Sequence, residues 1–226
     1  MARLARVVIP HLPHHITQRG NGRAKTFFCD DDYRLYLDLL SRHCAEAEVS
    51  IWAWVLMPNH VHLILTPRDA DGIRRALSKV HRTYAGRIHA RLRRSGHFWQ
   101  GRFGCVPMDE AHLAAALRYI ALNPVRARLA KRAVDWPWSS VHDQLSRRRS
   151  RKLTDTAPVR ERYPDFAALI AAGEDEDLSM ALRRAETIGR PLGDTAFLEA
   201  LERQTGRSLR PAKRGPKPRQ ARKLGR

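Results

Sequence analysis

Two histidines that lie two residues apart are the first residues that could carry out chemistry, because histidine binds metal ions. His60 and His62 flank Val61 within a run of β-forming residues. Because successive side chains of a strand point to opposite faces, we expect both imidazoles on one face and Val61 on the other. Two neutral imidazoles on one face can chelate a single metal ion. The chain holds 11 histidines, so this spacing arises easily by chance and predicts a metal site only together with other residues.

A tyrosine and an asparagine four residues apart supply that context. Tyr119 and Asn123 lie in a segment with helical periodicity, where such a spacing puts both side chains on one face. A tyrosine phenolate can attack a phosphodiester and form a covalent intermediate that conserves bond energy for rejoining. The amide oxygen of Asn123 is a hard ligand that favours Mg²⁺ or Mn²⁺. Spacing alone equally suits a tyrosine in the core and an asparagine that ends the helix before Pro124.

The charge of the chain predicts a polyanionic partner. Lys and Arg number 42 against 23 Asp and Glu, which gives a formal charge of +19 and a pI near 11.1. Nucleic acid is the leading partner class, and clustering of the basic residues argues against a merely solvated surface. Arginines would bind phosphates and Trp99 could stack on an unpaired base, although a tryptophan between glycines also commonly closes a core. The DNA-binding candidates are Arg19, Arg82, Trp99, Gln100, Arg102 and Arg126.

Several function classes are disfavoured. No window approaches about 18 consecutive apolar residues and no secretory signal precedes the first strand, so we expect a cytoplasmic protein with no membrane partner. The three cysteines, Cys29, Cys44 and Cys105, form no CxxC pair, which suits a reducing compartment. No GxxxxGK[ST] phosphate loop occurs, so no nucleotide cofactor is expected.

Hydrophobic periodicity predicts the elements that must position these side chains. Strands are expected at 14–19, 50–56, 60–66 and about 103–108, and helices at about 30–44, 72–92 and 110–122. Pro124 is expected to stop the last of these helices, because the residue before a proline is disfavoured in helical conformation. The order predicts an α+β fold of ferredoxin-like type, with four antiparallel strands and two helices on one face. The helix that carries Tyr119 is then an extra one, available to cover the other face.

Four segments of the chain resemble a known family of enzymes. They are 56–64 (LMPNHVHLI), 98–103 (FWQGRF), 119–127 (YIALNPVRA) and 136–140 (WPWSS), and the first strand with 16–21 (ITQRGN) fits as well. In this order they are similar to the REP-associated tyrosine transposases, which belong to the single-tyrosine branch of the HUH endonucleases. Four separate matches are far more specific than the histidine pair by itself.

The resemblance implies a catalytic domain that binds imperfect-palindrome hairpins in single-stranded DNA and nicks beside them. It implies that His60, His62 and Asn123 hold the divalent metal and that Tyr119 is the nucleophile, which becomes a 5′-phosphotyrosine. We therefore expect a metal-dependent endonuclease and strand transferase, a monomer or homodimer in the bacterial nucleoid. The alternatives are a non-catalytic single-strand-binding module and a hydrolase with a water nucleophile, which would form no protein–DNA adduct.

The composition changes beyond about residue 145. A basic run at 147–152 is followed by helical patterns at 165–172 and 175–188, and Asp194 can cap a further helix to about residue 204. The last sixteen residues hold seven Lys and Arg, three Pro and no acid, which predicts disorder in isolation. We expect a catalytic domain at 1–145, a helical extension at 146–210 and a basic disordered tail at 211–226.

Overall fold

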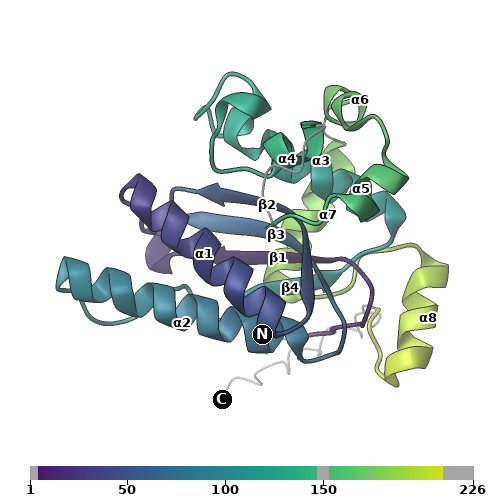
Figure 1. Cartoon of the computed structure of the whole chain (residues 1–226). Helices are drawn as coiled ribbons and strands as arrows, with labels where there is room; N and C mark the ends of the chain where they lie inside the picture. The colour runs from purple at the N-terminus through teal and green to yellow at the C-terminus, as the bar shows by residue number, and fades with distance from the viewer. Residues whose placement is uncertain (1–4, 147–152, 174, 211–226) are drawn as a thin grey trace, which may run out of the picture.

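The computed structural model describes residues 5–146, 153–173 and 175–210. The basic run expected at 147–152 and the tail expected at 211–226 lie outside the described residues. Within them, helices cover both faces of a single sheet (Figure 1).

The sheet has the strand order of a ferredoxin-like layer. It contains β1 (His14–Arg19), β2 (Val49–Met57), β3 (His60–Pro67) and β4 (Gly104–Pro107), in the spatial order β2-β3-β1-β4. All three pairings are antiparallel. The predicted fold class is therefore confirmed, and each strand lies within about two residues of its predicted range. Because β1 pairs with β3 in the centre of the sheet, residues at the end of β1 lie beside the histidines of β3.

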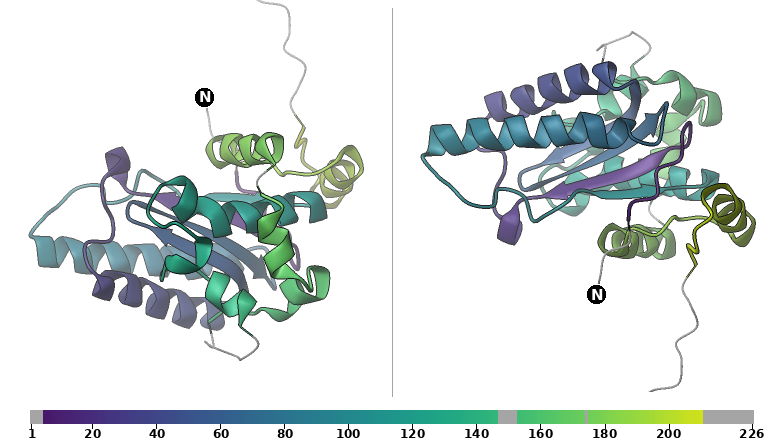
Figure 2. Two further views of the ribbon diagram at one scale, coloured as in Figure 1. Left: turned by 90° about the horizontal axis from the view of Figure 1, so that it is seen from above. Right: turned by 90° about the horizontal axis from the view of Figure 1, so that it is seen from below.

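Two long helices pack side by side on one face of the sheet. They are α1 (Asp30–Glu46) and α2 (Gly72–Leu92), which contact each other (Figure 2). Helix α1 contacts β2, and α2 contacts β2 and β3. Tyr36, Leu40 and Leu77 are fully buried there, as their helical spacing predicts. The apolar side chains of the sheet that meet these helices include Ile16 and Leu63.

The opposite face is covered by α3 (Glu110–Arg126), the extra helix of the prediction. Asp109 caps its start by accepting a hydrogen bond from the His112 backbone N–H at 2.9 Å. The predicted end before Pro124 was wrong, because α3 continues through Pro124 to Arg126. A proline removes one helical hydrogen bond. Here its ring is buried, and later backbone N–H groups donate to the carbonyls of Asn123 and Pro124, which sustains a further turn.

The segment that follows α3 covers the outer edge of β2. The backbone N–H of Leu56 donates to the Trp138 carbonyl at 2.9 Å, and the Trp136 indole N–H donates to the Leu56 carbonyl at 3.1 Å. Ser140 accepts from the Trp54 N–H at 2.9 Å. An edge strand presents unpaired backbone groups, so these contacts give a structural role to the WPWSS segment. The short helix α4 (Val141–Leu145), which was not predicted, follows it.

The described residues of the extension form four helices, of which the first follows Thr156 and the other three begin at aspartates. They are α5 (Ala157–Arg162), α6 (Phe166–Ala171), α7 (Glu176–Ile188) and α8 (Thr195–Thr205). Asp165, Asp175 and Asp194 each accept a hydrogen bond from the backbone N–H three residues later. The cap at Asp194 and the helices that follow Asp165 and Asp175 were predicted, whereas α5 was not. Helices α6 and α7 pack against α3, whereas α8 buries Leu201 in a separate cluster with the N-terminal segment.

One buried carboxylate joins the two helices of the first face. Asp32 in α1 has a side chain that is 1% exposed, and it accepts hydrogen bonds from the Phe28 backbone N–H at 2.8 Å and from Arg91 of α2 at 2.7 Å. Burial raises the pKa of this carboxyl, but the hydrogen bonds from Arg91 and from the backbone lower it more, so the net pKa lies below the ordinary value. The charged carboxylate therefore stabilises the fold.

We expect Asp32→Asn to lower the free energy of unfolding by about 1 to 3 kcal/mol at pH 7, since it weakens a charge-assisted hydrogen bond to a buried group. The carboxylate contributes fully above the ordinary aspartate pKa of about 3.9, and the contribution is lost as pH falls through the lower folded-state pKa. Urea unfolding at pH 7 and near pH 3 should show the deficit shrinking in acid. Asp38→Asn, on an exposed position of the same helix, is the control. Equal effects of the two substitutions would contradict the assignment.

Candidate active site

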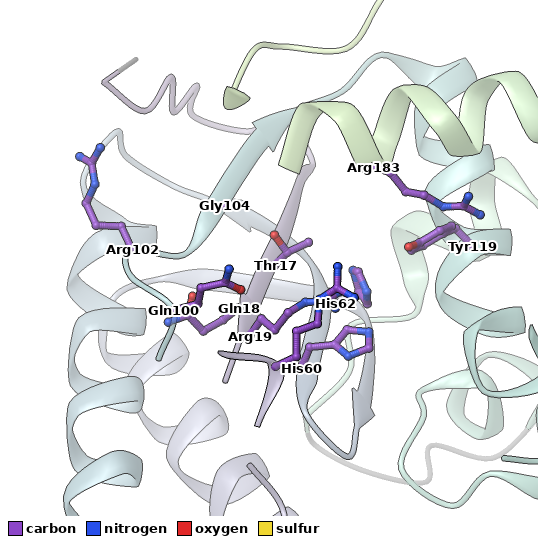
Figure 3. A pocket seen from close by; sticks show the side chains of 11 residues that line it. Thr17, Gln18, Arg19, His60, His62, Gln100, Arg102, Gly104, Tyr119 and Arg183 are labelled. Atoms are coloured by element: carbon purple, nitrogen blue, oxygen red, sulfur yellow. The ribbon is translucent and has the colours of Figure 1, made fainter. Parts of the chain in front are cut away.

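A pocket of about 390 Å³ lies on the α3 side of the sheet (Figure 3). Six predicted site residues line it, together with Thr17, Gln18, Arg23, Gly104 and Arg183, none of which was predicted. The six are Arg19, His60, His62, Gln100, Arg102 and Tyr119. They come from segments far apart in the sequence, so the fold assembles the pocket.

Strand pairing places the histidines on the pocket side. In the register of β1 with β3, Arg19 lies opposite His60 and Thr17 lies opposite His62. Val61 and Leu63 join the core beneath α1 and α2, whereas Ile64 joins the core beneath α3. Alternation along β3 thus directs both imidazoles toward α3, as the period of two predicts.

The nucleophile candidate and the histidine pair form one aromatic cluster. The ring centroids of His60 and His62 are 4.9 Å apart and those of His62 and Tyr119 are 5.1 Å apart, each pair nearly perpendicular. His62 is 1% exposed and Tyr119 is 5% exposed. The structure therefore brings Tyr119 of α3 against His62 of β3, with His60 on the other side of His62.

Each histidine has a partner for its Nδ1 atom. Nδ1 of His60 lies 2.6 Å from Asn59 Oδ1, and because that oxygen can only accept, His60 donates from Nδ1 and keeps the lone pair on Nε2. Nδ1 of His62 lies 3.1 Å from Nε2 of His15, whose ring stacks on it with 5.2 Å between centroids. A partner of this kind sets the tautomer and orientation of a metal-ligating imidazole.

His15 was missed as a site residue. The signal lies in the alternation of β1, which puts His15 on the same face as Thr17. Thr17 is the residue that pairs with His62 of β3. That signal can be used only once the pairing of β1 with β3 is known. The adjacent His14 has a structural role, because it accepts from the Ile9 backbone N–H at 3.1 Å and its Nδ1 lies 2.8 Å from the Leu12 carbonyl oxygen.

Burial keeps the site histidines neutral. It lowers the pKa of His60 to about 3, with a further contribution from the positive charges of Arg19 and Arg126. Burial likewise lowers the pKa of His62 well below its ordinary value and that of His15 to about 4. Neutral imidazole is the form that binds metals, so the protonation state suits the proposed ligands.

Asn123 is the candidate third ligand. It lies one turn beyond Tyr119 on α3, its side chain is 3% exposed, and it is not among the residues that line the pocket. Its amide nitrogen makes no hydrogen bond within the described residues, so the amide is not fully engaged by the protein. The described residues contain no group of three or more His, Cys, Asp and Glu able to hold a metal. The Asn123 amide oxygen is the hard donor that, added to the two imidazoles, would favour Mg²⁺ or Mn²⁺ over softer ions.

Arginines surround the tyrosine and the pocket. The guanidinium carbon of Arg126 lies 4.2 Å from the Tyr119 ring centroid, and that of Arg183 lies 5.8 Å away. Arg19, Arg23 and Arg102 line the pocket. The backbone N–H of Gln100 donates to the Arg19 carbonyl at 2.9 Å, which attaches the FWQGRF segment to the end of β1.

Two of the DNA-binding candidates lie away from the pocket. The indole N–H of Trp99 donates to the His81 carbonyl at 3.0 Å, and its ring packs against Tyr84 and Phe98. Arg82 is exposed on α2 and does not line the pocket. Their roles in DNA binding stay predictions. Among the helices of the described residues, none combines the length and the apolar character that a membrane span needs.

Comparisons with known proteins relate the chain to transposases. The family model described as "Transposase IS200 like" matches residues 9–123. A REP-associated tyrosine transposase of Escherichia coli (strain K12) is 26% identical over 96 residues, which are 42% of this chain and 56% of the E. coli protein. The chain thus matches little more than half the length of this curated relative. A solved structure of a REP-associated tyrosine transposase bound to a REP hairpin has a TM-score of 0.57 and 23% identity, over 65% of this chain and 87% of that chain, which shows a shared fold.

The contact between Asn59 and His60 predicts an effect on metal affinity. We expect Asn59→Ala to weaken Mn²⁺ binding by about 10- to 100-fold, the range typical of lost partners of ligating histidines. Asn59→Asp, which keeps an acceptor at the same place, should retain most of the affinity. Isothermal titration of the metal-free protein with Mn²⁺ measures both variants. Unchanged affinity in the alanine variant would remove Asn59 from this role.

Proposed function

The chain belongs to the family of IS200-like transposases, and on that premise we propose that it is a metal-dependent enzyme that cuts single-stranded DNA and rejoins its ends. The contact of Tyr119 with the histidine pair supports this proposal most directly. The ring centroids of Tyr119 and His62 are 5.1 Å apart, beside a pocket whose described lining residues include arginines and no carboxylate. A nucleophile that attacks an anionic phosphate requires surroundings of this charge.

Tyr119 is the proposed nucleophile. Its phenolic oxygen forms a bond to the scissile phosphorus while the bond from phosphorus to the 3′ oxygen breaks. The phenolic proton leaves to water and the departing oxygen gains a proton, so the products are a 5′-phosphotyrosine and a 3′-hydroxyl. Attack by a 3′-hydroxyl on the phosphotyrosine reverses the step, and rejoining therefore needs no ATP.

His60, His62 and Asn123 are the proposed ligands of a divalent ion, Mg²⁺ or Mn²⁺. When bound, the ion would supply a Lewis acid for the scissile phosphate. The protein contributes the neutral state of the imidazoles through burial, and the hydrogen bonds at Nδ1 hold their orientation. Asn123 shares α3 with Tyr119, so ligand and nucleophile move as one body.

We propose that the DNA partner is a hairpin formed by a palindromic repeat, in a bacterial nucleoid. The E. coli relative is named as REP-associated, and the solved structure with the same fold holds a REP hairpin. In this chain Arg19, Arg23 and Arg102 would neutralise backbone phosphates at the pocket. Gln100 adds an amide that can donate to phosphate or base.

Replacing the nucleophile separates this proposal from its two alternatives. We expect Tyr119→Phe to bind a labelled hairpin oligonucleotide about as tightly as the wild type but to form no covalent adduct with Mn²⁺ on a denaturing gel, because only the hydroxyl is removed. An adduct that persists in the variant would show that Tyr119 is not the nucleophile. For the wild type, binding without nicking would favour the non-catalytic module, and nicking without an adduct would favour a water nucleophile.

Metal removal provides an independent test. We expect EDTA to abolish nicking of the same oligonucleotide and either Mg²⁺ or Mn²⁺ to restore it. Restoration should fail in His62→Ala, since a buried ligand is lost, and should survive in His97→Ala, whose histidine is exposed and outside the pocket. Full nicking by the metal-free wild type would contradict the metal requirement.

A further inference from the structure

Helix α7 of the extension reaches the same pocket, although it lies beyond the family match at 9–123. It contacts both α3 and β4. Its buried residues Ser179, Leu182 and Ala185 recur every three positions and so share one face of the helix. Leu182 is part of the core that contains Tyr119. The packing therefore holds α7 at a defined position beside the nucleophile.

The residue that follows Leu182 extends from this packed face into the pocket. Arg183 lines the pocket together with His60 and His62, and its guanidinium carbon lies 5.8 Å from the Tyr119 ring centroid. Figure 3 shows its side chain reaching from the helix to lie beside that ring. Arg184, the next residue, is exposed and does not line the pocket.

The residues that line the pocket indicate what kind of ligand Arg183 would bind. The other cations on its walls are Arg19, Arg23 and Arg102, and no described lining residue carries a carboxylate. A guanidinium presents a planar fork of donors that matches two oxygens of a phosphate. Next to a nucleophile that attacks phosphorus, the DNA backbone would supply such oxygens.

We propose that Arg183 binds a DNA phosphate adjacent to the scissile bond, so that the C-terminal extension supplies part of the catalytic pocket. This inference rests on the proposed function, because it requires DNA in the pocket. It makes α7 a component of substrate binding and not only a cover for α3. If Arg183 only packed over the Tyr119 ring and bound no phosphate, removal of its charge would leave the salt dependence of DNA binding unchanged.

The test is the salt dependence of hairpin binding by the full chain. In a Tyr119→Phe background, which keeps the ring but prevents cleavage, we measure Kd for a labelled hairpin oligonucleotide with single-stranded flanks between about 50 and 200 mM NaCl. Each phosphate contact contributes about 0.7 to 0.9 to the slope of log K against log salt concentration. We expect Arg183→Gln to reduce the slope by about this amount and to weaken binding several-fold at low salt.

Matched variants separate charge from structure. Arg183→Lys should keep the slope, and Arg184→Gln should leave slope and Kd unchanged. Thermal melting reports on folding, and Arg183→Met, which keeps the aliphatic stem, replaces the glutamine variant if that one is unstable. An unchanged slope in Arg183→Gln or Arg183→Met, while the parent protein binds the hairpin, would overturn the inference. Absence of hairpin binding by the parent would instead overturn the proposed function.

Discussion

The packing of α3 across the face of the sheet from which the β3 histidines project is the contact on which the site depends. Small residues of α3, among them Ala115 and Ala116, are buried in one cluster with Val55 of β2 and Ile64 of β3. Small side chains let the helix lie close to the strands, and this closeness puts the Tyr119 ring 5.1 Å from that of His62. A helix held further from the sheet would separate the proposed nucleophile from the proposed metal ligands.

The same packing also buries the imidazoles of His60 and His62, the proposed metal ligands. Burial keeps these imidazoles unprotonated, although the chain as a whole is strongly positive. The formal charge of the chain is +19. Burial lowers the pKa values of His60 and His62, and the positive charges of neighbouring arginines lower them further. The same arginines that keep the imidazoles neutral are placed to attract a polyanion. Metal binding and DNA binding are thus compatible within one pocket, since the metal needs neutral imidazoles and the phosphates need cations.

Local signals were sufficient for most of the fold. Alternation in β3, helical spacing in α1 and the aspartate caps of α6, α7 and α8 each depend on nearby residues, and these elements were predicted. Pro124 misled the prediction because its local cost is outweighed by burial and later hydrogen bonds. His15 and Arg183 were missed for a different reason. Their proximity to His62 and Tyr119 comes from strand pairing and helix docking, which no spacing along the chain reveals.

The proposed function requires that Tyr119 becomes covalently linked to DNA beside the histidine pair. Mass spectrometry can detect this link in peptides from the wild-type protein, digested after incubation with a hairpin oligonucleotide and Mn²⁺. We expect the peptide containing Tyr119 to carry a nucleotide through a phosphotyrosine bond. A nucleotide attached to another residue, or cleaved DNA with no modified peptide, would contradict it.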